Sequence, residues 1–472
     1  MGVLSLSLLW LTGCQPSRSY AADVIHLTLW QGVNPPPNRD VLQKLVDQFN
    51  REHPQIQVES LYVGQSDQQM PKILAAVVGN ASPDLLWYAP VLTGQLLELD
   101  AIRPLETWLN QSSVRSQIDP SLFSSMELEG HIWSIPFGTN NVGIFYRPSL
   151  FQAAGITQLP QDWQTFRQVA HRLTRDTNGD GRVDQHGMVL PLGKGEWTVF
   201  TWLPFMWSGG GNLVELASPS QNAAEIQNPK RQEAGGRRQE ATLLIPPAKQ
   251  ELEALKGVQK SKIENPKSKI QSPPIQLLNP GAIAALQLWR DLMQDGSAIL
   301  SAPERGYELD GFLAGKVAMQ LSGPWTLGQL QATGVDFGVL PIPADKERAT
   351  VIGGENLFVF KTTPERERAA LVFAEYVLSE RFQTAWAIGT GYLPVNLQSR
   401  QSKEYLAFKA KQPTVETFLK QAAYGRSRPI LAGYNRISEN LGRAIEAVLM
   451  GRDTPEVALK ASQQRLDLIL RP

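Results

Sequence analysis

Apolar and polar residues alternate in the segment 23–30, where Ile25, Leu27 and Leu29 share one face. A period of two residues is typical of a half-buried strand. The segment ends in Trp30, so this strand is predicted to place an aromatic side chain at its carboxyl end.

Further along, the period changes to that of a helix and back again. Residues 39–52 carry a stripe of apolar side chains at helical spacing, and Pro54 ends that helix. A strand over 56–63, a helix over 68–79 and a short buried strand over 83–88 follow. Strands that alternate with helices predict βαβ units and a parallel sheet, in which ligands bind at the carboxyl ends of the strands.

Composition narrows the function classes. The chain has 472 residues, which predicts two or three lobes, and its 45 Lys and Arg balance 45 Asp and Glu. A nucleic-acid binder needs a surplus of cations, so that class is disfavoured. The single cysteine excludes an internal disulfide and a thiolate zinc site. The histidines never fall at the spacing of a histidine-paired metal hydrolase.

The lone cysteine stands where an apolar N-terminal run ends. Residues 3–12 have the length of the hydrophobic part of a secretory signal, and the quartet Leu-Thr-Gly-Cys ending at Cys14 resembles a bacterial lipobox. The motif predicts that residues 1–14 are a lipoprotein signal peptide and that Cys14 is lipidated. The exported chain would then be anchored to the cell membrane, facing the periplasm or cell exterior. A cleaved signal with an incidental cysteine and a buried N-terminal strand are the alternatives.

A different composition marks residues 217–276, which contain no Phe, Trp or Tyr and nearly repeat the motif Ile-x-Asn-Pro-Lys. Such a segment buries too little apolar surface to offset the entropy of ordering it. We interpret it as a disordered low-complexity insertion in a surface loop. The globular fold is expected to resume at Asn279 and Pro280, which suit the start of a helix over 281–293.

Five segments, in this order, carry a resemblance to a known family: 83–87, 135–147, 315–325, 337–354 and 389–395. The series resembles the extracellular solute-binding proteins of ABC sugar importers, the maltose-binding-protein-like family. The resemblance covers the chain from about residue 23 to residue 471, apart from the insertion.

The resemblance implies an α/β fold of the periplasmic-binding-protein type, with two lobes joined by a hinge of crossover strands. Lobe 1 would comprise residues 23–138 and 341–394, and lobe 2 residues 140–339 and 396–472, with the insertion inside lobe 2. The prolines at 136, 341 and 394 mark the three expected crossovers.

The function that the resemblance implies is capture of a sugar or sugar-like solute in the cleft between the lobes and its delivery to the membrane subunits of an ABC permease. A monomer that is no enzyme and requires no cofactor is expected. A secreted glycosidase is one alternative, which would need a pair of cleft carboxylates such as Glu196 and Glu355. A carbohydrate-sensing receptor or cell-wall adhesion protein is another.

Sugars present hydroxyl groups and flat C–H patches, so their binding requires aromatic platforms and groups that make paired hydrogen bonds. The resemblance implies that Trp87 and Trp325 stack on the sugar. Without that resemblance, a tryptophan is more often a core residue than a ligand platform. For the turn at 353–356, a plain hairpin turn is the alternative to a ligand-binding role. The candidate ligand-binding residues are Trp30, Trp87, Tyr88, Asn140, Asn141, Tyr146, Trp197, Trp325, Gly353, Gly354, Asn356 and Tyr392.

One departure from the family concerns the ligand. After Trp87 the sequence continues Tyr-Ala-Pro-Val, where maltose binders of the family carry charged residues that hold sugar hydroxyls. Maltose itself is therefore disfavoured, while other oligosaccharides, disaccharides and glycerol-phosphate esters stay open. Arg426 and Arg428 are the candidate phosphate anchors.

Residues 176–187 match the spacing of a calcium loop up to its ninth position. The twelfth position is Gly187 instead of the usual Glu, which predicts a weaker site. The role would be structural, and an Asx-rich turn without an ion is the alternative. The ligands would be Asp176, Asn178, Asp180, the carbonyl of Arg182, and Asp184.

Overall fold

The structure is a computed structural model that describes residues 24–214, 274–431 and 433–470. The predictions for Cys14 and residues 1–14, and nearly all of the insertion, lie outside the described residues. The two ends of the insertion pair with each other, because Val214 and Ile275 form an antiparallel bridge. Within the described ranges, no helix is both long and apolar enough to cross a membrane.

The first lobe is built on a five-stranded sheet of order β2-β1-β3-β14-β6. Its first three strands are parallel, and β14 runs antiparallel to both of its neighbours. The strands are β1 (Ile25–Gln31), β2 (Ile56–Tyr62), β3 (Leu85–Tyr88), β6 (Ile135–Pro136) and β14 (Asn356–Val359).

Helices cover both faces of this sheet, because successive strand residues point to opposite sides. In β3, Leu85 and Trp87 belong to one core and Leu86 and Tyr88 to the other. The first core is covered by α1 (Pro36–Glu52), α4 (Glu106–Gln111), α12 (Pro364–Leu378) and α13 (Glu380–Thr390), and the second by α2 (Ser66–Val78) and α3 (Thr93–Glu98).

The second lobe repeats this architecture with a sheet of order β10-β9-β11-β8-β12, again three parallel strands followed by two antiparallel pairings. Its strands are β8 (Gly143–Tyr146), β9 (His186–Leu190), β10 (Ala298–Leu300), β11 (Val317–Ser322) and β12 (Gly338–Leu340). One face packs on α5 (Pro148–Ala153), α6 (Trp163–Leu173), α7 (Glu196–Ser208), α9 (Pro280–Gln294), α16 (Tyr434–Leu449) and α17 (Pro455–Leu470). The other face packs on α10 (Asp310–Leu313), α11 (Leu327–Thr333), α14 (Lys403–Lys411) and α15 (Thr414–Ala422).

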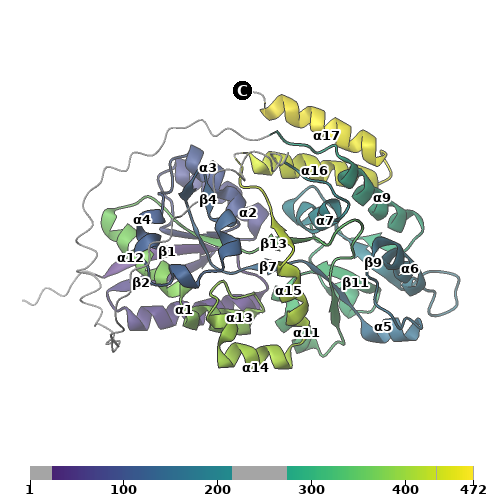
Figure 1. Cartoon of the computed structure of the whole chain (residues 1–472), viewed down its shortest axis with the longest axis horizontal. Helices are drawn as coiled ribbons and strands as arrows, with labels where there is room; N and C mark the ends of the chain where they lie inside the picture. Colours follow the sequence, from purple (N-terminus) through teal and green to yellow (C-terminus); the bar gives the residue numbers. More distant parts are fainter. Residues whose placement is uncertain (1–23, 215–273, 432, 471–472) are drawn as a thin grey trace, which may run out of the picture.

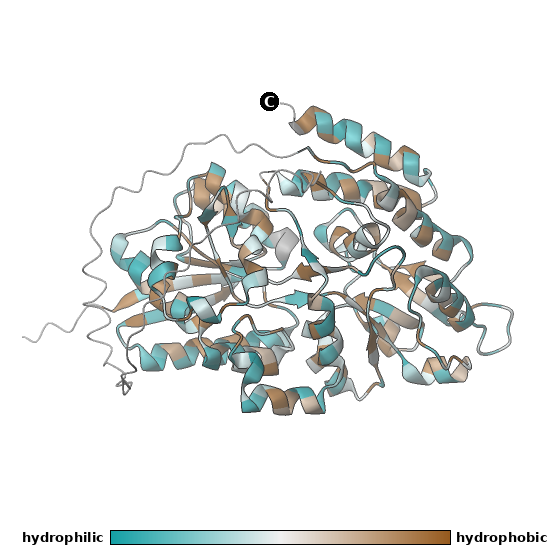
Figure 2. Cartoon of the chain, viewed as in Figure 1, coloured by the Kyte–Doolittle hydropathy of each residue, from teal (hydrophilic) through white to brown (hydrophobic). Residues whose placement is uncertain are grey.

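A small third sheet joins the lobes, with β13 (Thr350–Gly353) between β7 (Asn140–Asn141) and β15 (Gly425–Ser427). Figure 1 shows β7 and β13 at the centre of the molecule, between the two lobes. In Figure 2 the brown, hydrophobic segments lie mainly on the strands and on the helix faces turned toward them, while teal dominates the outer helix faces.

The second crossing lies later in the chain than the sequence suggested. We expected it at Pro341, but Ile342 and Ala349 are buried in the core of lobe 2. The indole nitrogen of Trp163 also donates to the carbonyl of Pro343 at 3.1 Å. The chain therefore passes to lobe 1 through β13 and β14, and the two prolines shape a loop of lobe 2.

The Pro-Asp pair before β3 serves the fold. Asp84 is 1% exposed and accepts from the guanidinium nitrogens Nε and Nη2 of Arg366, both at 2.6 Å, and from the backbone N–H of Thr28 at 2.8 Å. A buried carboxylate needs such partners. Asp84 thus ties the first strand to helix α12, through an arginine that comes 282 residues after Asp84 in the sequence.

Candidate ligand-binding site

A cavity of about 850 Å³ lies between the lobes and is lined by residues of both. Four aromatic rings follow one another along its wall. The ring centroid of Trp197 lies 6.5 Å from that of Tyr307 and 6.0 Å from that of Trp325. The centroid of Trp325 in turn lies 6.4 Å from that of Tyr392. Contiguous rings of this kind offer extended flat surfaces to a ligand.

Trp325 stands where the two lobes meet. It follows the carboxyl end of β11 directly, and its side chain packs against the main core of each lobe. The side-chain amide of Asn38, on α1 of lobe 1, donates to the carbonyl of Trp325 at 3.3 Å. Elsewhere between the lobes, Asn435 on α16 donates to the side-chain carbonyl of Gln95 on α3 at 2.8 Å. The lobes therefore touch through polar contacts at two places near the cavity.

A charged network forms part of the cavity wall. Glu196 begins α7, and its carboxylate accepts from the guanidinium of Arg428 at 2.6 Å, from the hydroxyl of Tyr434 at 3.1 Å, and from Ser438. Arg428 is 8% exposed and lies over the ring of Phe200 at 4.7 Å. A buried ion pair with these additional hydrogen bonds meets the condition under which such a pair is tolerated.

Glu355 lies at the second crossing and borders the cavity. Burial raises the pKa of Glu355 from 4.5 to about 7, although the hydroxyl of Tyr392 and the charge of Arg428 act in the opposite direction. The Tyr392 hydroxyl donates to the Glu355 carboxylate at 3.1 Å. Burial and that carboxylate together hold the pKa of Tyr392 well above its usual value.

Lobe 1 contributes a wall of a different kind. Apart from Glu355 at the crossing, its lining residues in the described part of the chain are uncharged: Gly32, Asn34, Pro35, Pro36, Gln65, Met70, Pro71, Trp87, Tyr88, Ala89, Val91 and Tyr392. Trp87 is 5% exposed, and its indole nitrogen has no hydrogen-bond partner among the described residues.

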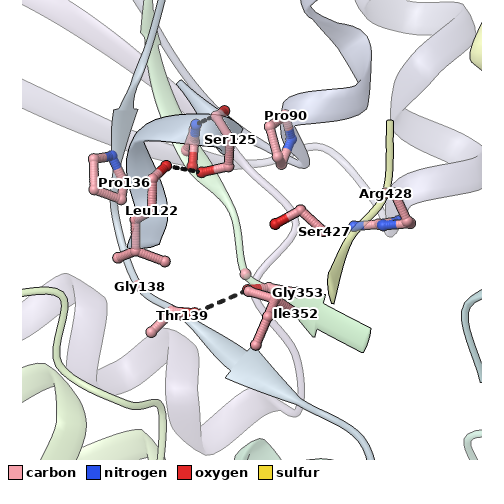
Figure 3. A pocket seen from close by; sticks show the side chains of 12 residues that line it. Pro90, Leu122, Ser125, Pro136, Gly138, Thr139, Ile352, Gly353, Ser427 and Arg428 are labelled. Carbon is pink, nitrogen blue, oxygen red and sulfur yellow. Dashed lines mark hydrogen bonds between the residues drawn. The ribbon is translucent and has the colours of Figure 1, made fainter. Parts of the chain in front are cut away.

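The structure brings together seven of the twelve predicted ligand-binding residues. The residues that line the cavity are Trp87, Tyr88, Asn140, Trp197, Trp325, Gly354 and Tyr392. Gly353 and Asn356 line a hollow of only about 10 Å³ at the crossings instead, too small for a solute. Figure 3 shows this hollow, with Thr139 of the first crossing donating to the carbonyl of Gly353 in the second, at 3.2 Å.

The backbone at position 354, in the second crossing, can be formed only by glycine. Its φ is +113°, and a Cβ atom there would lie 2.1 Å from the carbonyl oxygen of Gly138. The two crossings can therefore approach so closely only if this residue has no side chain. The strands on either side belong to different sheets, so the segment 353–356 is no plain hairpin.

Three predicted residues lie outside the cavity, which corrects their expected positions. Trp30 packs against the second core of lobe 1. Tyr146 packs on Phe151, with ring centroids 4.8 Å apart. Asn141 is fully buried, where it donates to the carbonyl of Phe418 at 2.8 Å.

Asn356 is also a residue of the fold, because its amide donates to the carbonyl of Ser125 and to the hydroxyl of Ser134, both at 2.8 Å. Conversely, the segment from Glu304 to Asp310 lines the cavity and includes Tyr307, although it was not among the predicted ligand-binding residues. These residues follow the carboxyl end of β10, a parallel strand, so the rule on ligand position in parallel sheets could have found them.

The candidate calcium loop is exposed and organised by its own hydrogen bonds. The carboxylate of Asp176 accepts from the backbone N–H of Gly179 at 2.6 Å and of Gly181 at 2.8 Å, and Asp184 accepts from Thr177. Backbone donors hold the pKa of Asp176 below its usual value, with Gly181 as the main one. Among the described residues, no three acidic, His or Cys side chains form a metal-binding group. Calcium binding therefore stays a prediction.

Comparisons with known proteins agree with the two-lobed architecture. A Thermotoga lettingae solute-binding protein of an ABC transporter, solved with α-D-tagatose, superposes with a TM-score of 0.74 at 20% identity, covering 95% of this chain and 100% of that one. The sn-glycerol-3-phosphate-binding periplasmic protein of Yersinia pseudotuberculosis is 21% identical over 473 residues, covering 96% of this chain and 93% of that protein. A binding protein of Brucella abortus is 20% identical over 374 residues, or 78% of this chain and 75% of that one.

Two α/β lobes around a shared, aromatic-lined cavity define a protein of the periplasmic-binding type. The family described as bacterial extracellular solute-binding protein matches residues 44–414. The chain belongs to this family. The fold class and the family predicted from the sequence are thereby confirmed.

Proposed function

We propose that this protein captures a sugar or sugar-like solute in the interlobe cavity and delivers it to the membrane subunits of an ABC importer. The observation that carries the proposal is the cavity itself, where contiguous aromatic rings face hydrogen-bonding carboxylates and amides. Rings provide stacking surfaces for the C–H faces of a sugar, and polar groups fix its hydroxyls. Names of relatives point the same way, since they include binders of α-D-tagatose and of sn-glycerol 3-phosphate.

Binding without chemical turnover separates this function from that of a glycosidase. A glycosidase needs one free carboxylate and one carboxylic acid on either side of the scissile bond. Here the carboxylate of Glu196 is already engaged by Arg428, Tyr434 and Ser438. We expect calorimetry to detect saccharide binding while chromatography of the same mixture recovers the saccharide intact; product formation would contradict the proposal.

The two lobes are expected to close around the solute by bending at the crossings, where β7, β13 and β15 form the only sheet between them among the described residues. Small-angle X-ray scattering of the monomer should show a smaller radius of gyration with the bound saccharide than without it. An unchanged radius would contradict closure.

Export and anchoring form the last part of the proposal. The family is extracellular, and the lipobox-like quartet supports attachment of the chain to the membrane through Cys14. The variant Cys14→Ser should appear in the soluble fraction, while the wild type partitions with membranes. Deleting the gene should also abolish uptake of the bound solute, whereas a sensor would leave uptake unchanged.

A further inference from the structure

We infer that the cavity takes an uncharged saccharide of more than one ring and excludes phosphate esters, an inference that rests on the proposed function and narrows its solute. The charge of the wall is the first observation. Among the described residues that line the cavity, the acidic ones are Glu196, Glu304, Glu308, Asp310, Glu355 and Glu439, and the basic ones are Lys194 and Arg428. Glu308 and Glu439 pair with Arg305 and Arg443, which lie outside this lining, so the negative excess is smaller than six carboxylates. The wall still carries more acidic than basic groups, which disfavours a phosphate.

The buried cation of the cavity is already matched. The guanidinium of Arg428 pairs with Glu196 at 2.6 Å, and the ring of Phe200 covers one of its faces at 4.7 Å. The charge of Glu355 also acts on Arg428. A phosphate that took the place of Glu196 would leave that carboxylate without its cation, which is costly for a partly buried pair. Only the Nε of Arg428, which has no hydrogen-bond partner among the described residues, is open without that exchange. Lys194, the other basic residue, is exposed to solvent.

The helix N-termini at the cavity are poorly suited to a phosphate as well, although such termini commonly bind one. At the start of α7, the carboxylate of Glu304 accepts from the backbone N–H of Lys194 at 2.9 Å and of Gly195 at 3.1 Å. At the start of α1, Pro36 and Pro37 occupy the first two positions and have no N–H to donate. The chain thus places its own carboxylate just before one terminus and removes donors from the other.

The same features suit a neutral saccharide. Ionised carboxylates accept hydrogen bonds only, and sugar hydroxyls can donate them. The segment from Glu304 to Asp310 brings acidic side chains and the ring of Tyr307 to one wall, next to Trp197. Ligand cavities range over about 300–1,000 Å³, so about 850 Å³ leaves room for more than one sugar ring.

Calorimetry on the full-length protein tests this inference with defined probes. The probes are inorganic phosphate, sn-glycerol 3-phosphate, glucose, glucosamine, and neutral saccharides of two and three rings, namely trehalose, cellobiose, raffinose and maltotriose. At least one neutral saccharide should bind, with an affinity that changes less than about twofold between about 50 and 300 mM salt. The phosphate compounds should give no binding at about 5 mM. Tighter binding of sn-glycerol 3-phosphate, glucose or glucosamine than of every di- and trisaccharide would overturn the inference.

A variant sharpens the charge argument. Glu304→Ala should free the N–H groups of Lys194 and Gly195 just before α7, remove a carboxylate from that helix terminus, and raise the affinity for sn-glycerol 3-phosphate at least about tenfold. Glu404→Gln, which removes the same charge from the exposed surface of α14, should not. Equal phosphate affinity in both variants would contradict the role of Glu304.

The outcomes also separate this inference from the proposed function. Preferred binding of a phosphate ester overturns the inference and leaves solute capture standing, whereas hydrolysis of a bound saccharide overturns solute capture and leaves the charge argument standing. If no probe binds at about 5 mM, both are contradicted.

Discussion

The two lobes share one sheet architecture but bring different chemistry to the cavity between them. Both sheets have three parallel strands followed by two antiparallel pairings. Among the described lining residues, and leaving aside Glu355 and Arg428 beside the crossings, lobe 1 contributes only uncharged ones, while lobe 2 contributes Lys194 and five of the carboxylates. The difference teaches that the fold provides the space and that the loops after the strands of each lobe decide its chemistry. Lobe 1 is a shape-giving wall, and lobe 2 is the wall that can select hydroxyl patterns.

The sharpest way to break this contrast is to remove the buried cation. Arg428→Met should lower the free energy of unfolding by about 3–5 kcal/mol, because it leaves Glu196 without its charge partner. Urea denaturation followed by circular dichroism measures the change. The double variant with Glu196→Gln should recover most of the loss.

Arg426 provides the matched control. It lies two residues earlier and pairs with Glu347 at 2.8 Å. Both side chains of this pair are more than one-third exposed, at 35% and 46%. Arg426→Met should change stability by less than about 1 kcal/mol, as exposed pairs do. Equal losses in the two single variants would show that burial of the pair is not what matters.

The next largest effect concerns pH and the crossing between the lobes. Because the pKa of Glu355 is raised from 4.5 to about 7 in the folded protein, the folded state binds this proton more tightly than the unfolded chain does. The stabilisation is present below pH 4.5 and is lost as the pH rises through about 7, by about 3 kcal/mol over that range.

Glu355→Gln should flatten this part of the stability profile, measured by urea denaturation at a series of pH values. Glu439→Gln, an exposed change in the same cavity, should leave the slope as it is in the wild type. A wild-type profile as flat as that of Glu355→Gln would contradict the assignment.

The aromatic rings give the third comparison. Trp325→Ala, in lobe 2, should weaken saccharide binding by about 10- to 100-fold, or about 1.4–2.7 kcal/mol, through loss of a stacking surface. Trp108→Ala removes a half-buried tryptophan of lobe 1 that does not line the cavity, and should leave the affinity unchanged. Isothermal calorimetry measures the saccharide affinity of both variants. If the two affinities are equal, Trp325 does not belong to the binding site.

The smallest expected effect lies in lobe 2, away from the cavity. If the exposed loop 176–187 binds calcium, millimolar calcium should raise the melting temperature by a few degrees, or about 1 kcal/mol. Asp180→Ala should abolish the shift. A wild-type melting temperature that does not respond to calcium would leave the loop as an Asx-rich turn.

Local periodicity predicted the N-terminal elements well, because each depends on residues close in sequence. The strand expected at 56–63 is β2, and the helix expected at 281–293 is α9, which Asn279 caps by accepting from the N–H of Ala282 at 2.9 Å. Helix α1 begins earlier than expected, at Pro36, since proline is tolerated in the first turn.

The site was predicted only in part, because its contacts join distant segments. Glu196 and Arg428 are 232 residues apart in sequence, so no local pattern could reveal their pairing. Asn140 and Asn141 were expected to share one role, but neighbouring residues of a strand face opposite sides. Asn140 lines the cavity, and Asn141 is bound to Phe418 inside the fold.

The place of β14 in the first sheet has a consequence for how the chain matures. This strand, residues 356–359, lies between β3 and β6, so the first lobe lacks one of its inner strands until most of the sequence has been synthesised. The sheet of the first lobe therefore cannot be completed until residues 356–359 have left the ribosome.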